Sequence, residues 1–202
     1  IGRELLTAPE KYRIRGLCFY DAGSRSFYTK NSPINKPSDL DGLKIRTQES
    51  ATAMQMVRTM GGSPTPIAWG ELYSALQQGI VDGAENNPPS FYLSHHYEVC
   101  KYYSLDEHTA VPDVLIISKV LWDELTPQEQ QIIQEAANES EEYEKKLWKD
   151  ATQTALEEVA KAGVEIIHPD KKPFQEAVEP MYESYRENPE IYSLIQRIRN
   201  VE

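Results

Sequence analysis

Two arginines stand where predicted strands end, and an arginine at such a position is suited to hold a carboxylate. Arg46 ends the segment 43–46, and alternation along a strand sends Ile45 to one face and Arg46 to the other. Arg25 follows a predicted strand that ends at Tyr20. Ligands of open α/β sheets bind outside the carboxyl ends of strands, where a guanidinium can donate two parallel hydrogen bonds to a carboxylate. A surface arginine and a solvated loop arginine are the alternative interpretations.

Polar and aromatic residues follow two further predicted strands. Asn86 and Asn87 come after the segment 80–84, and their amides can donate to and accept from ligand hydroxyl and carboxylate groups. Trp69 follows the segment 65–68, where an indole can stack on the apolar face of a sugar ring. An ordinary turn rich in Asn and Pro, and core packing of the tryptophan, are the alternatives.

Support for an active site or a metal site is weak. Glu71, Asp82 and Glu85 lie near the same strand ends, where a pair of carboxylates could perform acid–base catalysis. Their spacing matches no known catalytic motif, and the sequence has no Gly-x-Ser-x-Gly, glycine-rich phosphate loop or His-Glu-x-x-His. His95 and His96 are adjacent, and neighbouring side chains on a helix point apart. We therefore expect a structural or surface role for these histidines, and no metal and no cofactor.

Composition narrows the classes of partner. The chain has 202 residues, 40% of them hydrophobic, and a formal net charge of −11. A phosphate backbone would repel this charge, so we expect no nucleic-acid binding. No apolar run approaches the roughly 20 residues that a membrane span needs, so we expect no stable membrane insertion. A small anionic ligand stays compatible where a few basic groups gather.

The two cysteines are expected to be buried strand residues. Cys18 and Cys100 each lie in an apolar or aromatic stretch. A disulfide between them is the alternative, and their spacing resembles no metal or redox motif.

Short apolar segments alternate with helical ones, which is typical of a mostly parallel sheet with helices on its faces. The predicted strands are 13–20, 43–46, 65–68, 80–84, 97–103, 111–118 and 164–167. The segment 111–118 is nearly continuous in apolar residues, so we expect it to be buried on both faces. Ser50 and Thr126 are predicted helix caps. The helix after Thr126 would be roughly 50 Å long at 1.5 Å per residue, so we expect it to lie across two lobes.

Three segments together resemble the TRAP transporter solute-binding proteins of the DctP family. They are Gly-Leu-Lys-Ile-Arg at 42–46, Met-Gly-Gly-Ser-Pro-Thr-Pro at 60–66, and the run from Trp69 to Asn86. The resemblance continues through 112–118 and the long helix, so it covers essentially the whole chain. It implies the α/β, two-lobed periplasmic binding protein fold, with a cleft and a long bridging helix.

The resemblance also implies a domain organisation. It gives 1–15 as the end of the first lobe or a hinge, 16–105 as the second α/β lobe, 106–140 as the return to the first lobe, 126–162 as the bridging helix, and 163–202 as the C-terminal strand and helices. Family members carry roughly a hundred residues ahead of the segment seen here, a domain-sized length. We therefore expect this chain to be the C-terminal two thirds of such a protein.

The resemblance implies which residues bind the ligand. Arg46 matches the arginine that pairs with the ligand carboxylate, Arg25 a second arginine, and Asn86 an asparagine that holds the carboxylate from the opposite side. The full expected set is Arg46, Arg25, Asn86, Trp69, Glu49, His108 and Asn87. In this set, Trp69 and His108 match cleft positions, while Glu49 and Asn87 are expected near ligand hydroxyls.

The function implied by the resemblance is periplasmic capture of an organic acid and its delivery to TRAP permease subunits, without catalysis. The segments 21–28 and 85–92 resemble members that bind hexuronates such as glucuronate or galacturonate. A C4-dicarboxylate or another sugar acid is an alternative ligand, and an enzyme that processes sugar acids is an alternative function. We expect a monomer.

Overall fold

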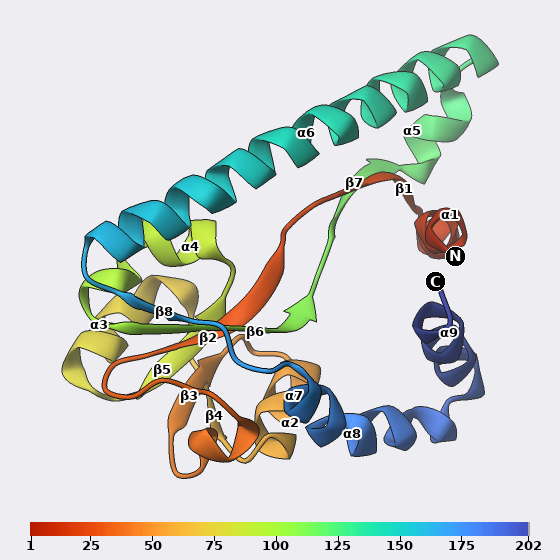
Figure 1. The fold of residues 1–202 in the computed structure, drawn as a ribbon. Helices are drawn as coiled ribbons and strands as arrows, with labels where there is room; N and C mark the ends of the chain where they lie inside the picture. The colour runs from red at the N-terminus through yellow and green to blue at the C-terminus, as the bar shows by residue number, and fades with distance from the viewer. Residues whose placement is uncertain (202) are drawn as a thin grey trace. The chain divides into compact units, whose positions relative to one another are not determined.

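The computed structural model describes residues 1–201, which form two compact units (Figure 1). Unit 1 consists of Ile1–Gly23 and Val111–Ala151. Unit 2 consists of Ser24–Ala110 and the chain from Thr152 onward. The lobe boundaries expected from the family resemblance describe a longer protein, and they stay a prediction.

Unit 1 is built on an antiparallel pair of strands. β1 (Ile14–Tyr20) pairs with β7 (Asp113–Ser118), so both predicted strands of this unit form. The helices are α1 (Gly2–Thr7), α5 (Lys119–Glu124) and the first part of α6 (Pro127–Lys161), with a 3₁₀ helix at Ala8–Tyr12. The core of this unit consists of Leu17, Cys18, Trp122 and Ala137.

The expectation that 111–118 is buried on both faces is wrong. Val114 is 43% exposed and Ile116 is 57% exposed, whereas Leu115 and Ile117 pack against the core of unit 1. The reason is that β7 pairs with β1 alone within the described chain, and the core covers one face of this pair. A continuous apolar run therefore behaves as an alternating strand here.

The long helix forms as predicted. The hydroxyl oxygen of Thr126 accepts a hydrogen bond from the Glu129 backbone N–H at 3.3 Å, and the Glu129 carboxylate accepts one from the Thr126 backbone N–H at 2.8 Å. This reciprocal capping starts α6, which then continues for 35 residues. The division between the units falls inside this helix, at Ala151, so its two parts belong to different units.

Unit 2 contains a six-stranded mixed sheet within the described residues, in the order β4-β3-β5-β2-β6-β8. The strands are β2 (Ser24–Thr29), β3 (Lys44–Thr47), β4 (Ser63–Pro66), β5 (Gly83–Asn86), β6 (Tyr102–Ala110) and β8 (Glu165–Ile167). β3 runs parallel to β4 and β5, and β6 runs parallel to β8. β2 is antiparallel to both of its neighbours, so the expectation of a mostly parallel sheet holds only away from β2.

Helices cover both faces of this sheet (Figure 1). They are α2 (Ala51–Thr59), α3 (Leu72–Gln78), α4 (Pro88–Leu93), α7 (Lys172–Ala177) and α8 (Glu179–Ser184). The last helix, α9 (Pro189–Arg199), contacts α8 and the 3₁₀ helix at Tyr185–Glu187. Two separate cores result, because successive residues of a strand point to opposite faces. Tyr28 belongs to the core with Leu72 and Phe91, and its neighbour Phe27 belongs to the core with Val57 and Phe174.

The predicted strand 97–103 is wrong from residue 97 to residue 101. His95 adopts a left-handed backbone conformation with φ of 60°, and a 3₁₀ helix follows at His96–Glu98. β6 therefore begins at Tyr102 and continues through the polar run 106–109, which composition alone did not mark as a strand. The expectation that Cys100 lies in a strand is wrong, because it precedes β6 in this turn, but it is a buried free thiol. Cys18 is a buried free thiol within β1, as expected.

A change at Gly83 tests how closely β2 and β5 approach. A Cβ atom at Gly83 would overlap the carbonyl oxygen of Tyr28 on β2. We expect Gly83→Ala to lower the free energy of unfolding by about 1–3 kcal/mol, because overpacking forces the strands to shift. Gly70→Ala is the matched control, since a Cβ there meets no atom within 4 Å. Urea denaturation of the intact protein measures both, and equal effects would contradict this packing.

Candidate functional site

Arg46 is a buried cation that no carboxylate of the described chain neutralises. The residue is 3% exposed, and its Nε donates a 2.8 Å hydrogen bond to the Ile67 carbonyl oxygen. Its Nη1 is buried without a hydrogen-bond partner among residues 1–201. Burial lowers the pKa of Arg46 from its ordinary value. Since Ile45 points into the opposite core, the predicted facing of these two residues is confirmed.

Trp69 lies beside this guanidinium. The Cζ atom of Arg46 is 5.6 Å from the centroid of the Trp69 ring, within the range of a cation–π contact. The indole is 45% exposed, so part of its surface stays open to a ligand. Trp69 opens the 3₁₀ helix Trp69–Glu71, which precedes α3.

His96 completes the surroundings of Trp69. Its ring centroid is 5.1 Å from that of Trp69, and its Nδ1 is hydrogen-bonded to the Tyr28 hydroxyl at 2.8 Å. Burial lowers the pKa of His96 to about 4, and the nearby Arg46 charge adds to the effect. His96 is therefore neutral at neutral pH.

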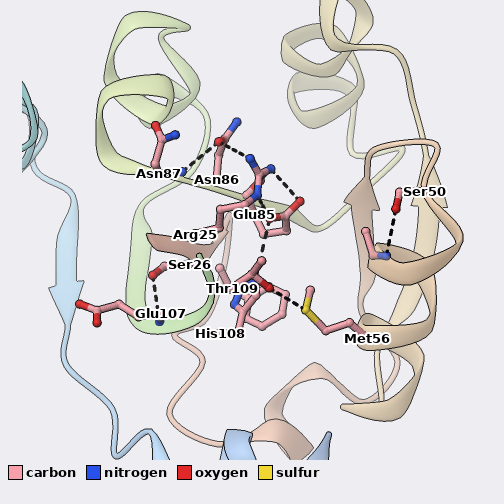
Figure 2. A network of polar contacts seen from close by, with 12 residues as sticks. Arg25, Ser26, Ser50, Met56, Glu85, Asn86, Asn87, Glu107, His108 and Thr109 are labelled. Carbon is pink, nitrogen blue, oxygen red and sulfur yellow. Dashed lines mark hydrogen bonds and ion pairs between the residues drawn. The ribbon is translucent and has the colours of Figure 1, made fainter. Parts of the chain in front are cut away.

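Arg25 is also close to the site, but its charge is balanced by the protein (Figure 2). Its Nε donates to Glu85 Oε2 at 2.5 Å, and its Nη2 donates to Glu85 Oε1 at 2.9 Å. Its Nη1 donates to the Asn86 side-chain oxygen at 2.8 Å. Burial would lower the pKa of Arg25, but the Glu85 carboxylate raises it above its ordinary value. The bidentate pair joins β2 to β5 across the sheet.

His108 and Asp106 form a second buried ion pair beside the first. His108 Nδ1 lies 2.7 Å from Asp106 Oδ2, and His108 Nε2 lies 3.7 Å from Glu85 Oε2, which is an ion-pair distance but too long for a hydrogen bond. The His108 ring also stacks on Phe27 at 4.2 Å. Burial would lower the pKa of His108, but Asp106 and Glu85 raise it to about 9.

The electrostatic consequence is that Arg46 carries the unbalanced charge of this region. Arg25 and protonated His108 supply two positive charges, and Glu85 and Asp106 supply two negative charges. These four groups cancel, whereas Arg46 has no such partner within residues 1–201. Within residues 1–201, Arg46 is therefore the buried cation of this region that lacks a counter-ion.

Of the three remaining predicted residues, Asn86 and Asn87 are buried near Arg25, and Glu49 is exposed. Asn86 accepts from Arg25 and from the Asn87 backbone N–H, so its amide N–H₂ group points away from Arg25 (Figure 2). The Asn87 side-chain oxygen caps α4 by accepting from the Ser90 N–H at 2.9 Å. Glu49 is exposed, and the described chain shows no hydrogen bond or ion pair between it and the other predicted residues.

A cavity of about 500 Å³ in unit 2 lies next to this cluster without including most of it. Asp106 and His108 line it together with Lys171, Phe174 and Tyr182. None of the other predicted binding residues lines this cavity, so it is not the space that Arg46 faces.

Sequence reasoning undervalued four residues of the site: Tyr28, Glu85, His96 and Asp106. Glu85 was considered only as an acid–base candidate, because its pairing with Arg25 depends on the register between β2 and β5. Asp106 had a usable signal, since it is only two residues from His108 in the chain. His96 and Tyr28 gave no such signal, because they are 68 residues apart in the chain.

A comparison of this sequence with models of protein families shows which family the chain belongs to. The profile of the bacterial extracellular solute-binding protein family 7, DctP, matches residues 1–188. The chain belongs to this family.

Solved members of family 7 have the same fold. A TRAP periplasmic solute-binding protein from Sulfitobacter sp. NAS-14.1, with bound β-D-galacturonate, is 42% identical with a TM-score of 0.93, covering 99% of this chain and 67% of that one. The corresponding protein from Chromohalobacter salexigens, with bound D-glucuronate, is 37% identical with a TM-score of 0.95, covering 100% and 67%. The predicted α/β fold of the family, in which the long helix connects two lobes, is thereby confirmed.

A protein from Salmonella typhimurium, YiiZ, is 44% identical to this chain over 185 residues. That match covers 91% of this chain and 57% of the relative, so the chain spans little more than half of that protein's length. Among residues 1–201, no helix is long and apolar enough to cross a bilayer. The same residues contain no group of three His, Cys, Asp or Glu side chains placed to hold a metal ion.

The raised pKa of His108 predicts a pH dependence of stability. A group whose pKa is about 9 when folded and 6.5 when unfolded stabilises the fold fully below about pH 6.5, and loses this contribution as the pH rises through 9. We expect the free energy of unfolding to fall between pH 6.5 and 8.5, and His108→Gln to flatten this decline. Urea denaturation across this range measures it.

The exposed His168 provides the control for this experiment. His168→Gln should keep the decline of the unmodified protein. A decline that persists unchanged in His108→Gln would show that the His108–Asp106 ion pair is not its source.

Proposed function

We propose that this chain carries the acid-binding residues of a protein that captures a hexuronate, D-glucuronate or D-galacturonate, in the periplasm. The protein delivers this ligand to the permease subunits of a TRAP transporter and acts as a monomer. Membership of family 7 and the hexuronates bound to the solved relatives support this proposal.

The main support for this proposal is that the Arg46 guanidinium is buried without a counter-ion among residues 1–201. A buried guanidinium without a counter-ion is costly, because the single hydrogen bond to the Ile67 carbonyl replaces only part of its lost hydration. A ligand carboxylate that accepts from Nη1 would supply both the charge and the missing hydrogen bond. The binding energy then comes from satisfying a group that the fold leaves unsatisfied.

The charge balance favours a ligand with one carboxylate. Arg25 is already paired with Glu85, so it offers little net charge to a second carboxylate. A C4-dicarboxylate brings two negative charges, and the described part of the site offers one unbalanced cation. A hexuronate brings one carboxylate and a ring of hydroxyls.

The groups around Arg46 suit the rest of a sugar acid. The half-exposed Trp69 indole can stack against the C–H face of a pyranose ring. The amide N–H₂ of Asn86 points away from its Arg25 contact, so it can donate to a ligand oxygen. This combination of one guanidinium, one aromatic face and one amide fits a hexuronate better than a purely aliphatic acid.

The ionisation of Glu85 argues against an enzyme. Burial would raise the pKa of Glu85, but His108 and Arg25 lower it below its ordinary value. A carboxylate held ionised in this way is a poor general acid near neutral pH. Both of its oxygens also accept from Arg25, so the group acts as structural support for the site.

Replacement of Arg46 tests the proposal. We expect Arg46→Lys to weaken D-glucuronate binding on the order of tenfold to hundredfold, because one ammonium cannot reproduce the paired hydrogen bonds of a guanidinium. Isothermal titration calorimetry of the intact protein measures the loss. D-galacturonate and succinate, titrated in parallel, distinguish a hexuronate site from a dicarboxylate site.

Arg58→Lys is the matched control, since Arg58 is an exposed arginine on α2. It should bind D-glucuronate as the unmodified protein does. Equal affinities of Arg46→Lys and the unmodified protein would contradict the proposal, and so would tighter binding of succinate. Recovery of a chemically altered ligand by NMR would favour an enzyme instead.

A further inference from the structure

His96 is buried next to the proposed acid site, although it is not one of the residues expected to bind the ligand. It begins the 3₁₀ helix His96–Glu98 and is 2% exposed. The left-handed conformation of His95 turns the chain there, so that His96 points inward while His95 stays exposed on the surface. The burial of His96 excludes the surface role that was one of the two roles expected for it.

Two contacts fix the orientation of this imidazole. Its Nδ1 is held by the hydroxyl of Tyr28, a fully buried residue in the centre of the sheet. Its ring contacts the Trp69 indole at 5.1 Å, with an angle of 59° between the two planes. The indole in turn lies 5.6 Å from the Cζ atom of Arg46. His96 is therefore in contact with the indole that lies beside Arg46.

We propose that His96 is a positioning residue of the acid site, which holds Trp69 against Arg46 and takes up a proton when a carboxylate binds there. This inference rests on the proposed function, because it requires an acid bound to Arg46. It adds a residue and a proton to that site.

The proton uptake follows from the charges near His96. In the ligand-free protein, burial and the Arg46 charge lower the pKa of His96 to about 4. A carboxylate bound to Arg46 offsets the repulsion between the two cations, so it raises the pKa of His96. By reciprocity, ligand affinity must increase as the pH falls toward the range in which His96 titrates.

The hydrogen bond to Tyr28 can survive this protonation. A tyrosine hydroxyl can donate to a neutral imidazole nitrogen, and it can accept from a protonated one. Burial raises the pKa of Tyr28 well above its ordinary value, so the hydroxyl stays protonated throughout. Protonation of His96 therefore reverses this hydrogen bond without breaking it.

Few other charged groups act on His96. Arg46 faces it from β3, the Tyr28 hydroxyl faces it from β2, and the uncharged Trp69 faces it from the 3₁₀ helix before α3. On its own segment, His95 and Glu98 form an exposed ion pair with each other at 3.2 Å. The bound carboxylate is thus the main new charge that His96 would experience.

Calorimetry of the intact protein with D-glucuronate at pH 5 to 7.5 tests the inference. Titrations in buffers with different ionisation enthalpies give the number of protons taken up. We expect uptake near zero at pH 7.5 that rises toward pH 5, and its loss in His96→Gln. The variant should also bind about threefold to tenfold more weakly at pH 7.5, as expected for one lost hydrogen bond or aromatic contact.

His95→Gln is the matched control, because it changes the neighbouring exposed histidine. It should keep both the affinity and the proton uptake. If His96→Gln binds D-glucuronate with the same pH profile as the unmodified protein, this inference is wrong and the proposed function stands. If the unmodified protein does not bind hexuronates, the proposed function is wrong and this inference falls with it.

A measurement on the unmodified protein keeps the test independent of how well the variant folds. An NMR titration follows the imidazoles of the four histidines with and without D-glucuronate. We expect the histidine with the lowest pKa to titrate at higher pH in the complex. An unchanged titration of this histidine would overturn the inference.

Discussion

The unpaired guanidinium of Arg46 is the constraint on which the site depends. The backbone of β3 places this residue on the face of the sheet that also carries Tyr28, and the Ile67 carbonyl satisfies only its Nε. Burying such a group has a free-energy cost that the rest of the fold must offset. Proteins retain such a cost at functional sites, where a ligand supplies the counter-ion and the hydrogen-bond acceptor that the fold lacks.

The charged residues near Arg46 neutralise one another and leave the Arg46 charge unbalanced. Arg25, Glu85, His108 and Asp106 lie within one buried region, and their charges cancel. This network joins β2, β5 and β6, so it supports the strand ends that carry the site. Because the charges of these four residues cancel, they attract anions only weakly. Arg46 is then the residue of this region that attracts an anion.

Much of the fold could be predicted from the sequence, because local signals agree with it. Thr126 and Glu129 set the start of α6, and alternation placed Ile45 and Arg46 on opposite faces. The pairing of Arg25 with Glu85 depends on the register between β2 and β5, 60 residues apart, which composition does not encode. The turn at His95 and the exposed face of β7 were missed for a similar reason. Tertiary contacts decide both, and an apolar run alone does not reveal how many partners a strand has.

The most direct test is a crystal structure of the intact protein with bound D-glucuronate. We expect the ligand carboxylate to lie about 3 Å from the Nη1 atom of Arg46, with the sugar ring against Trp69. Glu85 should stay paired with Arg25 in the complex. A carboxylate bound elsewhere, or an Arg46 already paired with a carboxylate from another part of the protein, would show that Arg46 is not the residue that binds the acid.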